Sequence, residues 1–555
     1  MKLDLAQVPF SRYGSYLAID RLAGNEHRVG GIYLRTLHGD ATCAEVCRIE
    51  LLCEGLPVEP VIDLTPSALL LTYHSHSLAI CFSNNHTLLF QGQGLGVRLH
   101  FDAALYDSAM QWRDAWLINR FSNRMRYVFA SKNGALLHRD VLPDNTFDAL
   151  PDASGNLMLA LAEALLACPT AEILFERDFS ACRKEVEQKF SQWLLATPSV
   201  PAEFSAAREL AAYVQWSSVV AAKEKLERSA MLMSKHWLNA VWSWDHCFNA
   251  MALLDISPAL AWDQYMLLFD HQDEWGALPD CVSDKTMVWN FCKPPVHGWA
   301  LRWMLQHGAV SSEQLSEIYA PLARWTQWWF DTRAADDELP QYFHGNDSGW
   351  DNASVFDAGV PVQSPDLAAF LVVQMDVLAD IAQRLNDAYE VTRWQQRADN
   401  LLKKMLTHYW HNNRFVALHD RKPCAGDSLL LQMPIILGHR LPKSIRADLI
   451  AALKQDNRFL TQCGLASESI ESELYESDGY WRGPMWAPAV FLIVESLREL
   501  GESAFADDIA MRFCKTVARS GMAENFDALT GEGLRDRAHT WTASVFLLLA
   551  ANDKC

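Results

Sequence analysis

The spacing of apolar residues changes near residue 200, and the change divides the chain into two parts. Before this point, short apolar runs recur roughly every ten to twenty residues and are separated by Gly, Asn, Pro and Ser; examples are 28–34, 68–73, 78–82, 96–101 and 125–130. Short runs bounded by turn residues are typical of β-strands. Residues up to about 190 are therefore predicted to form an antiparallel β-sandwich.

Pro198 and Pro201 mark a linker, and beyond it the apolar period shifts toward 3.6 residues, which indicates helices. Many segments open with a capping residue or proline, as at Ser257-Pro258 and Ser364-Pro365. The expected helices are 203–227, 243–254, 257–270, 297–307, 312–332, 365–387, 389–410, 443–454, 483–499, 503–518 and 538–551. We therefore predict two domains, 1–195 and 196–555, and a mainly α chain. Periodicity alone fits both a closed ring of helix pairs and an open solenoid.

Composition excludes several classes of function. The net charge is -20 and no Lys/Arg-rich run is present, so a nucleic-acid partner is not expected. The first residues lack the pattern of a secretory signal, and no uncharged apolar stretch reaches 18 residues, so a cytoplasmic protein with no membrane partner is predicted. The 13 cysteines are odd in number and lie mostly in apolar runs, as reduced thiols do. The sequence has no linear metal-binding or nucleotide-binding motif, so no metal site and no cofactor are predicted.

Two acidic residues lie on glycine-rich loops beside tryptophans. Asp351 follows Ser348-Gly349-Trp350, and Glu524 precedes a Thr530-Gly531 turn. Cleavage of a glycosidic bond requires one carboxyl to protonate the leaving oxygen and another to activate water or attack carbon. The pair therefore predicts a sugar-cleaving site. The alternatives are an Asx-turn at Asp351 and a surface turn at Glu524.

Tryptophan is unusually frequent, with 21 residues in 555. Core packing accounts for some of them, but those near acidic residues or glycine are expected to line a carbohydrate pocket, because indole faces stack on sugar rings. These candidates are Trp242, Trp244, Trp275, Trp289, Trp299, Trp350, Trp481, Trp486 and Trp541. Asp245, in the first turn of a predicted helix, could hold sugar hydroxyls or could balance the helix macrodipole.

Five segments carry a resemblance to a known family: W-x-W-D at 242–245, P-P-V-x-x-W-A at 294–300, S-G-x-D-N at 348–352, Y-W-R-G-P-x-W at 480–486 and E-N-F-x-x-x-T-G-E-G at 524–533. In this order, over roughly residues 205–550, the chain resembles glycoside hydrolase family 63 and its mannosylglycerate-hydrolase-like relatives. The resemblance implies an (α/α)6 barrel, with Asp351 as general acid, Glu524 as general base and inversion at the anomeric carbon. It further implies that Trp242, Trp244, Asp245, Arg482 and Trp486 shape the sugar pocket. Arg482 could instead be a structural ion-pair partner. The chain has Asn346-Asp347 where relatives often have Trp-Glu, which leaves the sugar open.

The chemistry sets physical requirements for this site. An inverting enzyme keeps its carboxyls about 6.5–9.5 Å apart so that a water molecule fits between sugar and base. Asp351 must stay protonated near neutral pH, which apolar Trp350 and negative Asp347 could favour by raising its pKa. Glu524 must be ionised, with Asn525 or the loop glycines as hydrogen-bond donors.

These features predict an inverting, exo-acting α-glycosidase that hydrolyses small α-glucosides or related oligosaccharides. We expect the β-sandwich to pack beside the barrel, where it could contribute a loop to the pocket mouth, and a homo-oligomer is possible. A glycoside phosphorylase on the same barrel and a catalytically inactive sugar-binding protein are the alternatives. Phosphate dependence would identify the first, and ligand binding without turnover the second.

Overall fold

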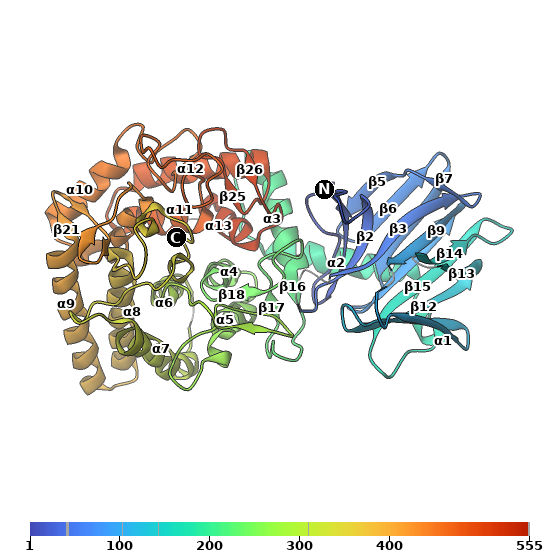
Figure 1. Ribbon diagram of the computed structural model, residues 1–555, viewed down its shortest axis with the longest axis horizontal. Coiled ribbons are helices and arrows are strands. Elements are labelled where there is room, and N and C mark those ends of the chain that lie inside the picture. Colours follow the sequence, from blue (N-terminus) through green and yellow to red (C-terminus); the bar gives the residue numbers. More distant parts are fainter. Residues whose placement is uncertain (40–43, 103, 142–143, 309, 553–555) are drawn as a thin grey trace.

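The chain forms a β-rich part and a helical part that lie side by side (Figure 1). The computed structural model describes residues 1–39, 44–102, 104–141, 144–308 and 310–552. The first part contains the strands β1 (Leu17–Leu22), β2 (Gly31–Thr36), β3 (Glu45–Cys53), β4 (Leu56–Val58), β5 (Val61–Thr65), β6 (Ala68–Tyr73), β7 (His76–Phe82), β8 (Thr87–Gln93), β9 (Leu95–Asp102), β10 (Ser108–Trp112), β11 (Ala115–Arg120), β12 (Met125–Asn133), β13 (Ala135–Val141), β14 (Asp144–Leu150) and β15 (Asn156–Ala164).

These strands build two antiparallel sheets. One has the order β1-β2-β3-β9-β14-β13, with β4 paired to β3, and the other has the order β10-β11-β12-β15-β8-β7-β6-β5. Because side chains alternate between the two faces of a strand, each sheet turns one apolar face inward. Leu34, Leu99, Phe90 and Phe129 from the two sheets belong to one buried cluster. The predicted β-sandwich is confirmed.

The prediction of β-structure as far as residue 190 is wrong for its last segment. Residues 171–196 form two helices, α1 (Ala171–Leu174) and α2 (Phe179–Ala196), and Asp178 caps α2 by accepting a hydrogen bond from the backbone of Ala181. Only Phe179, Cys182, Val186 and Phe190 of α2 are buried, so one stripe of this helix packs inward and the rest faces water. We retain residues 1–195 and 196–555 as the proposed domains.

The helical part alternates inner and outer helices. The inner segments are α4 (Asp245–Leu253), α6 (His297–His307), α8 (Pro365–Arg384), η6 (Leu429–Arg440), α11 (Ala487–Glu499) and α13 (Thr540–Ala550). The outer ones are α3 (Ser205–Ser218), α5 (Pro258–Met266), α7 (Ser312–Arg333), α9 (Ala388–Tyr409), α10 (Lys443–Lys454) and α12 (Ser503–Ser520). Helix α3 ends at Ser218, earlier than the predicted 203–227.

The inner segments close a ring. Helix α4 contacts α6, α6 contacts α8, α8 contacts η6, η6 contacts α11, α11 contacts α13, and α13 returns to α4. Inner segments also pack on outer helices, as α8 does on α9 and α11 on α12. This is an (α/α)6 barrel, as expected, and the open solenoid is excluded.

Short strands and loops connect the helices at the ends of the barrel. They include β16 (Val219–Val220), β17 (Ala230–Met231), β18 (Val241–Trp242), β19 (Cys281–Val282), β20 (Met287–Val288), β21 (Trp410–His411), β22 (Arg414–Phe415), β23 (Leu418–His419), β24 (Lys422–Pro423), β25 (Asn525–Phe526) and β26 (Gly533–Leu534). All the candidate catalytic residues lie in or beside these connections, which a rigid ring of helices holds in place.

Buried polar contacts join the two parts. The Nζ atom of Lys235 donates to Ser11 Oγ at 3.1 Å and to the carbonyl oxygens of Ser15 and Val219 at 2.5 and 3.2 Å. Arg35 on β2 pairs with Asp20 on β1 at 2.6 Å, and it also donates to the carbonyl oxygen of Lys235 in the helical part at 3.3 Å. Because a displacement would break these buried hydrogen bonds, they fix how the two parts pack.

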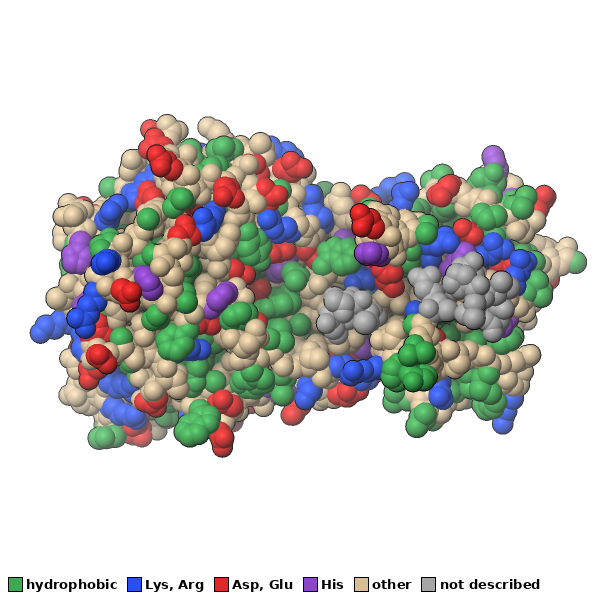
Figure 2. All heavy atoms as spheres, in the orientation of Figure 1, with side chains coloured by type: hydrophobic (Ala, Val, Ile, Leu, Met, Phe, Trp, Pro, Cys, Tyr) green, Lys and Arg blue, Asp and Glu red, His purple; other side chains and the backbone are tan. Residues whose placement is uncertain are grey.

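The surface is mixed in charge. Figure 2 shows Lys and Arg side chains interspersed with Asp and Glu over the visible face of both parts. In the described part of the chain, no helix combines the length and the apolar character needed to cross a membrane. The cysteines that the structure describes are all free thiols.

Candidate active site

The loop that carries Asp351 is fixed by close packing. A Cβ on Gly345 would lie 1.8 Å from the carbonyl oxygen of Asp351, so only glycine fits there. Gly349 has a φ of +72° and packs against the ring of Trp244, where a Cβ would approach to 2.7 Å. Asp347 accepts hydrogen bonds from the backbone N–H groups of Cys292, Phe343 and His344, at 3.1, 3.0 and 3.2 Å. The loop therefore presents Asp351 in one orientation.

Asp351 lies beside a buried lysine. Its Oδ1 atom is 3.9 Å from Lys293 Nζ, which is also 3.3 Å from Asp280 Oδ1 and donates to the carbonyl oxygen of Asn346 at 3.0 Å. Burial raises the pKa of Asp351, and the charge of Lys293 opposes this rise. The expectation that Asp347 raises this pKa is wrong: the charged groups that act on Asp351 are Lys293 and His344, and the charge of Asp347 acts on Asp280 instead.

Asp245 belongs to the same charge cluster. It lies in the first turn of α4, is 5% exposed, and burial raises its pKa to about 8, with the charges of Asp280 and Asp351 acting in the same direction and Lys293 against it. Asp245, Asp280, Asp351 and Lys293 therefore share one electrostatic field. In the free site Asp245 is mostly protonated at neutral pH, so it can donate one hydrogen bond to a sugar hydroxyl and accept another.

Glu524 lies on the connection between α12 and β25. Its backbone N–H donates to Asp536 O at 2.7 Å, and its carbonyl accepts from Trp541 Nε1 at 3.1 Å. Burial raises the pKa of Glu524 to about 7, and the charge of Asp536 adds to the rise. The Tyr480 hydroxyl donates to Glu524 Oε1 at 3.2 Å and favours the ionised form. Asn525 does not supply the expected hydrogen bond, because its buried Nδ2 group has no hydrogen-bond partner among the described residues.

The charges of both candidate catalytic carboxyls act on Tyr480. Burial raises the pKa of its hydroxyl, and the charges of Glu524, Asp351 and Asp245 raise it further, in that order. The Tyr480 hydroxyl is hydrogen-bonded to Glu524, and the backbone N–H of the next residue, Trp481, donates to Asn352 Oδ1 at 2.9 Å. The fold thus brings Asp351 and Glu524, 173 positions apart in the sequence (524 − 351), to one site.

Five of the candidate indoles pack together in one cluster beside this site. Trp350 lies 4.5 Å from Trp481, which stacks on Trp486 at 3.9 Å; Trp541 lies 5.5 Å from Trp486 and 5.8 Å from Trp244. All five are at most 4% exposed. They therefore connect the acid loop to the base loop as a packed floor, and most of their surface is covered by protein.

Three further candidates lie around this cluster. Trp242 on β18 is half-buried, and its carbonyl oxygen is 3.0 Å from His246 Nδ1. Trp299 on α6 is 2% exposed and packs on Phe491 of α11, so it belongs to the barrel core rather than to the cluster. Arg482 pairs with Asp357 and donates to the carbonyl oxygen of Asn352 at 2.8 Å, which gives it the structural role of fastening the acid loop.

Sequence reasoning missed Tyr480, Asp280, Lys293 and Asp536 as site residues. Tyr480 has a φ of +64°, which is costly for a bulky residue and persists only where the surroundings impose it. Lys293 directly precedes the two prolines of the 294–300 segment, and nothing in the sequence around Lys293 or Asp280 indicates that the two side chains meet. Only the fold places a lysine among three aspartates.

The described residues also contain a group with the composition of a metal site. One potential ligand atom from each of His246, Cys247 and His297 lies within 4.8 Å of the others, and all three residues are buried. Burial lowers the pKa of both histidines, so their rings are neutral and can act as ligands for a soft cation. The sequence search for linear motifs had predicted no metal site, because these ligands come from two different helices.

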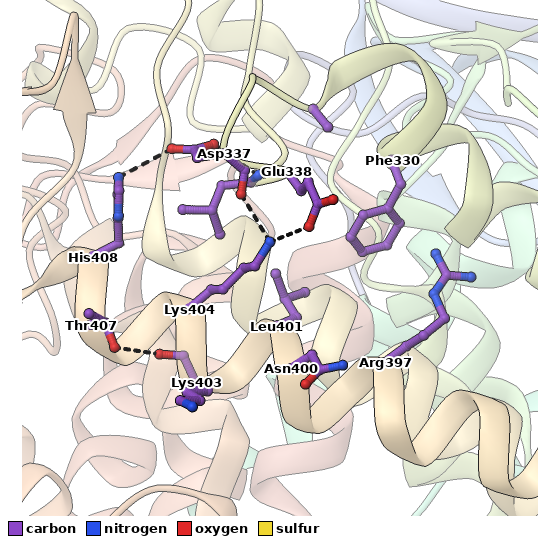
Figure 3. A pocket seen from close by; sticks show the side chains of 12 residues that line it. Phe330, Asp337, Glu338, Arg397, Asn400, Leu401, Lys403, Lys404, Thr407 and His408 are labelled. Carbon is purple, nitrogen blue, oxygen red and sulfur yellow. Dashed lines mark hydrogen bonds and ion pairs between the residues drawn. The ribbon is translucent and has the colours of Figure 1, made fainter.

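A surface pocket of about 730 Å³ lies elsewhere, along α9 (Figure 3). Some of its charged groups pair with one another: Lys404 pairs with Glu338 and donates to the Asp337 carbonyl, and His408 lies 3.3 Å from Asp337. Neither candidate catalytic carboxyl lines it.

Comparison with known proteins places the helical part in a family. The family model of the mannosylglycerate hydrolase MGH1-like glycoside hydrolase domain matches residues 238–542. A mannosylglycerate hydrolase from Thermus thermophilus is 22% identical over 58% of this chain and 97% of its own length. A glucosylglycerate hydrolase from Mycolicibacterium hassiacum is 20% identical over 55% of this chain and 91% of its own.

Two solved structures show the same architecture. The mannosylglycerate hydrolase of glycoside hydrolase family 63 from Thermus thermophilus, in complex with Tris, has a TM-score of 0.54 at 20% identity and covers 61% of this chain and 99% of its own. A bacterial glucoamylase in complex with acarbose has a TM-score of 0.65 at 11% identity and covers 99% of this chain and 93% of its own. The second likeness extends over the β-sandwich as well as the barrel.

Proposed function

Because the chain belongs to the mannosylglycerate hydrolase MGH1-like glycoside hydrolase family, we propose that it is an inverting, exo-acting α-glycosidase of small α-glucosides or related oligosaccharides. The observation that carries the proposal is the contact between the loops of two buried carboxyls of raised pKa: the Tyr480 hydroxyl donates to Glu524, and the backbone N–H of the next residue, Trp481, donates to Asn352 beside Asp351. The names of the relatives, mannosylglycerate hydrolase and glucosylglycerate hydrolase, support a small glycoside as substrate.

Asp351 is the proposed general acid and Glu524 the proposed general base. A protonated Asp351 delivers its proton to the glycosidic oxygen as the bond to the anomeric carbon breaks. An ionised Glu524 removes a proton from the water that attacks that carbon from the opposite face. A base with a pKa of about 7 is half ionised at neutral pH and still a strong proton acceptor. We expect a bell-shaped pH dependence, with the acid limb set by Glu524 and the basic limb by Asp351.

The first test combines product stereochemistry with two variants. Anomer-resolved NMR on α-glucosides and α-mannosides should show β-sugar as the first product, without a requirement for phosphate. Asp351→Asn should abolish hydrolysis of unactivated glycosides but retain α-glycosyl fluoride hydrolysis, since fluoride leaves without a proton. Glu524→Gln should abolish both reactions. Glu532→Gln changes an exposed glutamate on the same loop and serves as the control.

Three results would contradict the proposal. Prompt release of α-sugar would exclude Glu524 as the base of an inverting reaction. A strict requirement for phosphate would indicate a phosphorylase. Sugar binding without turnover would indicate an inactive binding protein.

A further inference from the structure

An exposed indole, Trp237, lies beside the base loop and has no part in the mechanism above. It is 42% exposed, in contrast to the buried indoles of the floor. Its backbone N–H donates to Asp536 Oδ2 at 3.1 Å, and Ser234 Oγ donates to Asp536 Oδ1 at 3.0 Å. Because the backbone carbonyl of Asp536 also accepts from Glu524, one residue fixes both Trp237 and the proposed base.

Two buried groups pack against the Trp237 ring: Arg35 of the β-sandwich and the neighbouring His236. The guanidinium of Arg35 lies 5.0 Å from the centre of the Trp237 ring, and the His236 ring lies 4.6 Å from it at an angle of 26°. Arg35 is 1% and His236 6% exposed. Since both supporting groups are almost inaccessible to water, the exposed surface of Trp237 belongs to its outer side.

A second contact ties the same loop to the sandwich. Asn239 Nδ2 donates to the carbonyl oxygens of Leu37 and Gly39, at 3.3 and 2.9 Å. The loop that bears Trp237 is thus held between the segment that follows β2 and Asp536. A large side chain held this rigidly loses little conformational entropy when a ligand stacks on it.

We propose that Trp237 is a stacking platform for the leaving group of the substrate, specifically for a second sugar ring or a polar ring of similar size. The proposal rests on the exo-glycosidase function above: if the pocket holds only the terminal sugar, every part of the substrate outside it belongs to the leaving group. An indole face binds the C–H face of a pyranose, and its apolar surface imposes little requirement on hydroxyl configuration. The β-sandwich would then help to determine which leaving groups are accepted, through Arg35 and the segment after β2.

The test compares substrates with and without a leaving-group ring. Trp237→Ala and Trp237→Phe are assayed on α-glucosyl and α-mannosyl fluoride and on the corresponding disaccharides. Trp237→Ala should lower kcat/KM on the disaccharide by about tenfold, mainly through KM, and leave fluoride hydrolysis within about twofold. Trp237→Phe should retain most of the disaccharide activity. Tyr389→Ala, which removes a 75% exposed aromatic ring at the start of α9, is the matched control and should change neither activity.

Two results would overturn the inference. An equal loss on fluoride and disaccharide would show that Trp237 acts through the Glu524 loop, and no loss on either would show that the leaving group does not contact it. Failure of the proposed function is distinguishable, because the wild-type enzyme would then hydrolyse neither class of substrate.

Discussion

Replacing Tyr480 by Phe tests how the site controls the charge of its base. The substitution removes one hydroxyl, which donates to Glu524 Oε1 at 3.2 Å, and leaves the ring that packs 4.8 Å from Trp486. The hydroxyl stabilises the ionised form of Glu524, so its loss makes protonation easier. The pKa of Glu524 should therefore rise, and the acid limb of kcat/KM should move to higher pH.

The size of the shift follows from the geometry. A hydrogen bond to a charged group contributes about 1.5–3 kcal/mol, and one pKa unit corresponds to about 1.36 kcal/mol. The 3.2 Å separation is longer than the usual range for O–H···O contacts, so the lower end applies and we expect a shift of about one unit. With the pKa of Glu524 at about 7 in the native enzyme, its ionised fraction at pH 7 should fall from about a half to about a tenth. The expected result is an approximately fivefold lower kcat/KM at pH 7 that recovers above pH 9.

The assay is a pH profile of kcat/KM on a glycosyl fluoride, which isolates the base because no proton donor is needed. Tyr475→Phe is the matched control, since this tyrosine lies five positions earlier and its hydroxyl has no hydrogen-bond partner among the described residues. An acid limb that stays in place, or moves to lower pH, would show that Tyr480 does not stabilise the ionised base. A loss that is the same at every pH would point to a positioning role instead.

Two other substitutions each remove a buried cation, one in the active site and one in the β-sandwich. Lys293→Met removes the cation that opposes the rise in the pKa of Asp351, so the basic limb of kcat/KM on a disaccharide should move to higher pH. A limb that moves to lower pH would contradict the charge interactions described for this site. Arg35→Met leaves Asp20 buried without its cation and should lower the free energy of unfolding by about 3–5 kcal/mol, as measured by urea denaturation. An unchanged denaturation midpoint would mean that the ion pair does not contribute to stability.

The sequence was sufficient to predict elements whose ends carry local signals. Ser311 caps α7 through a reciprocal pair of hydrogen bonds with Gln314, and Pro365 begins α8, and both starts were predicted within one residue. The inner segment 429–440 was missed. Its residues Leu429 to Gly438 are all buried, so no polar stripe marks a helical period, and Pro434 interrupts it. An inner helix of a barrel is buried on all sides, so its sequence lacks the amphipathic pattern by which helices are recognised.

In the active site, the sequence likewise indicated the candidate residues but not the partners that the fold brings next to them. Gly349 and Trp350 indicate a tight aromatic loop at Asp351, because that signal is local. The partner that most strongly opposes the raised pKa of Asp351 is Lys293, 58 positions earlier in the sequence (351 − 293), on a segment that precedes a different helix of the ring. Asp347, four positions away, was the local guess, but its charge acts on Asp280 rather than on Asp351. A pKa in this site is therefore a property of the closed barrel, so a variant that shifts one barrel helix should alter the pH profile even when Asp351 and Glu524 are untouched.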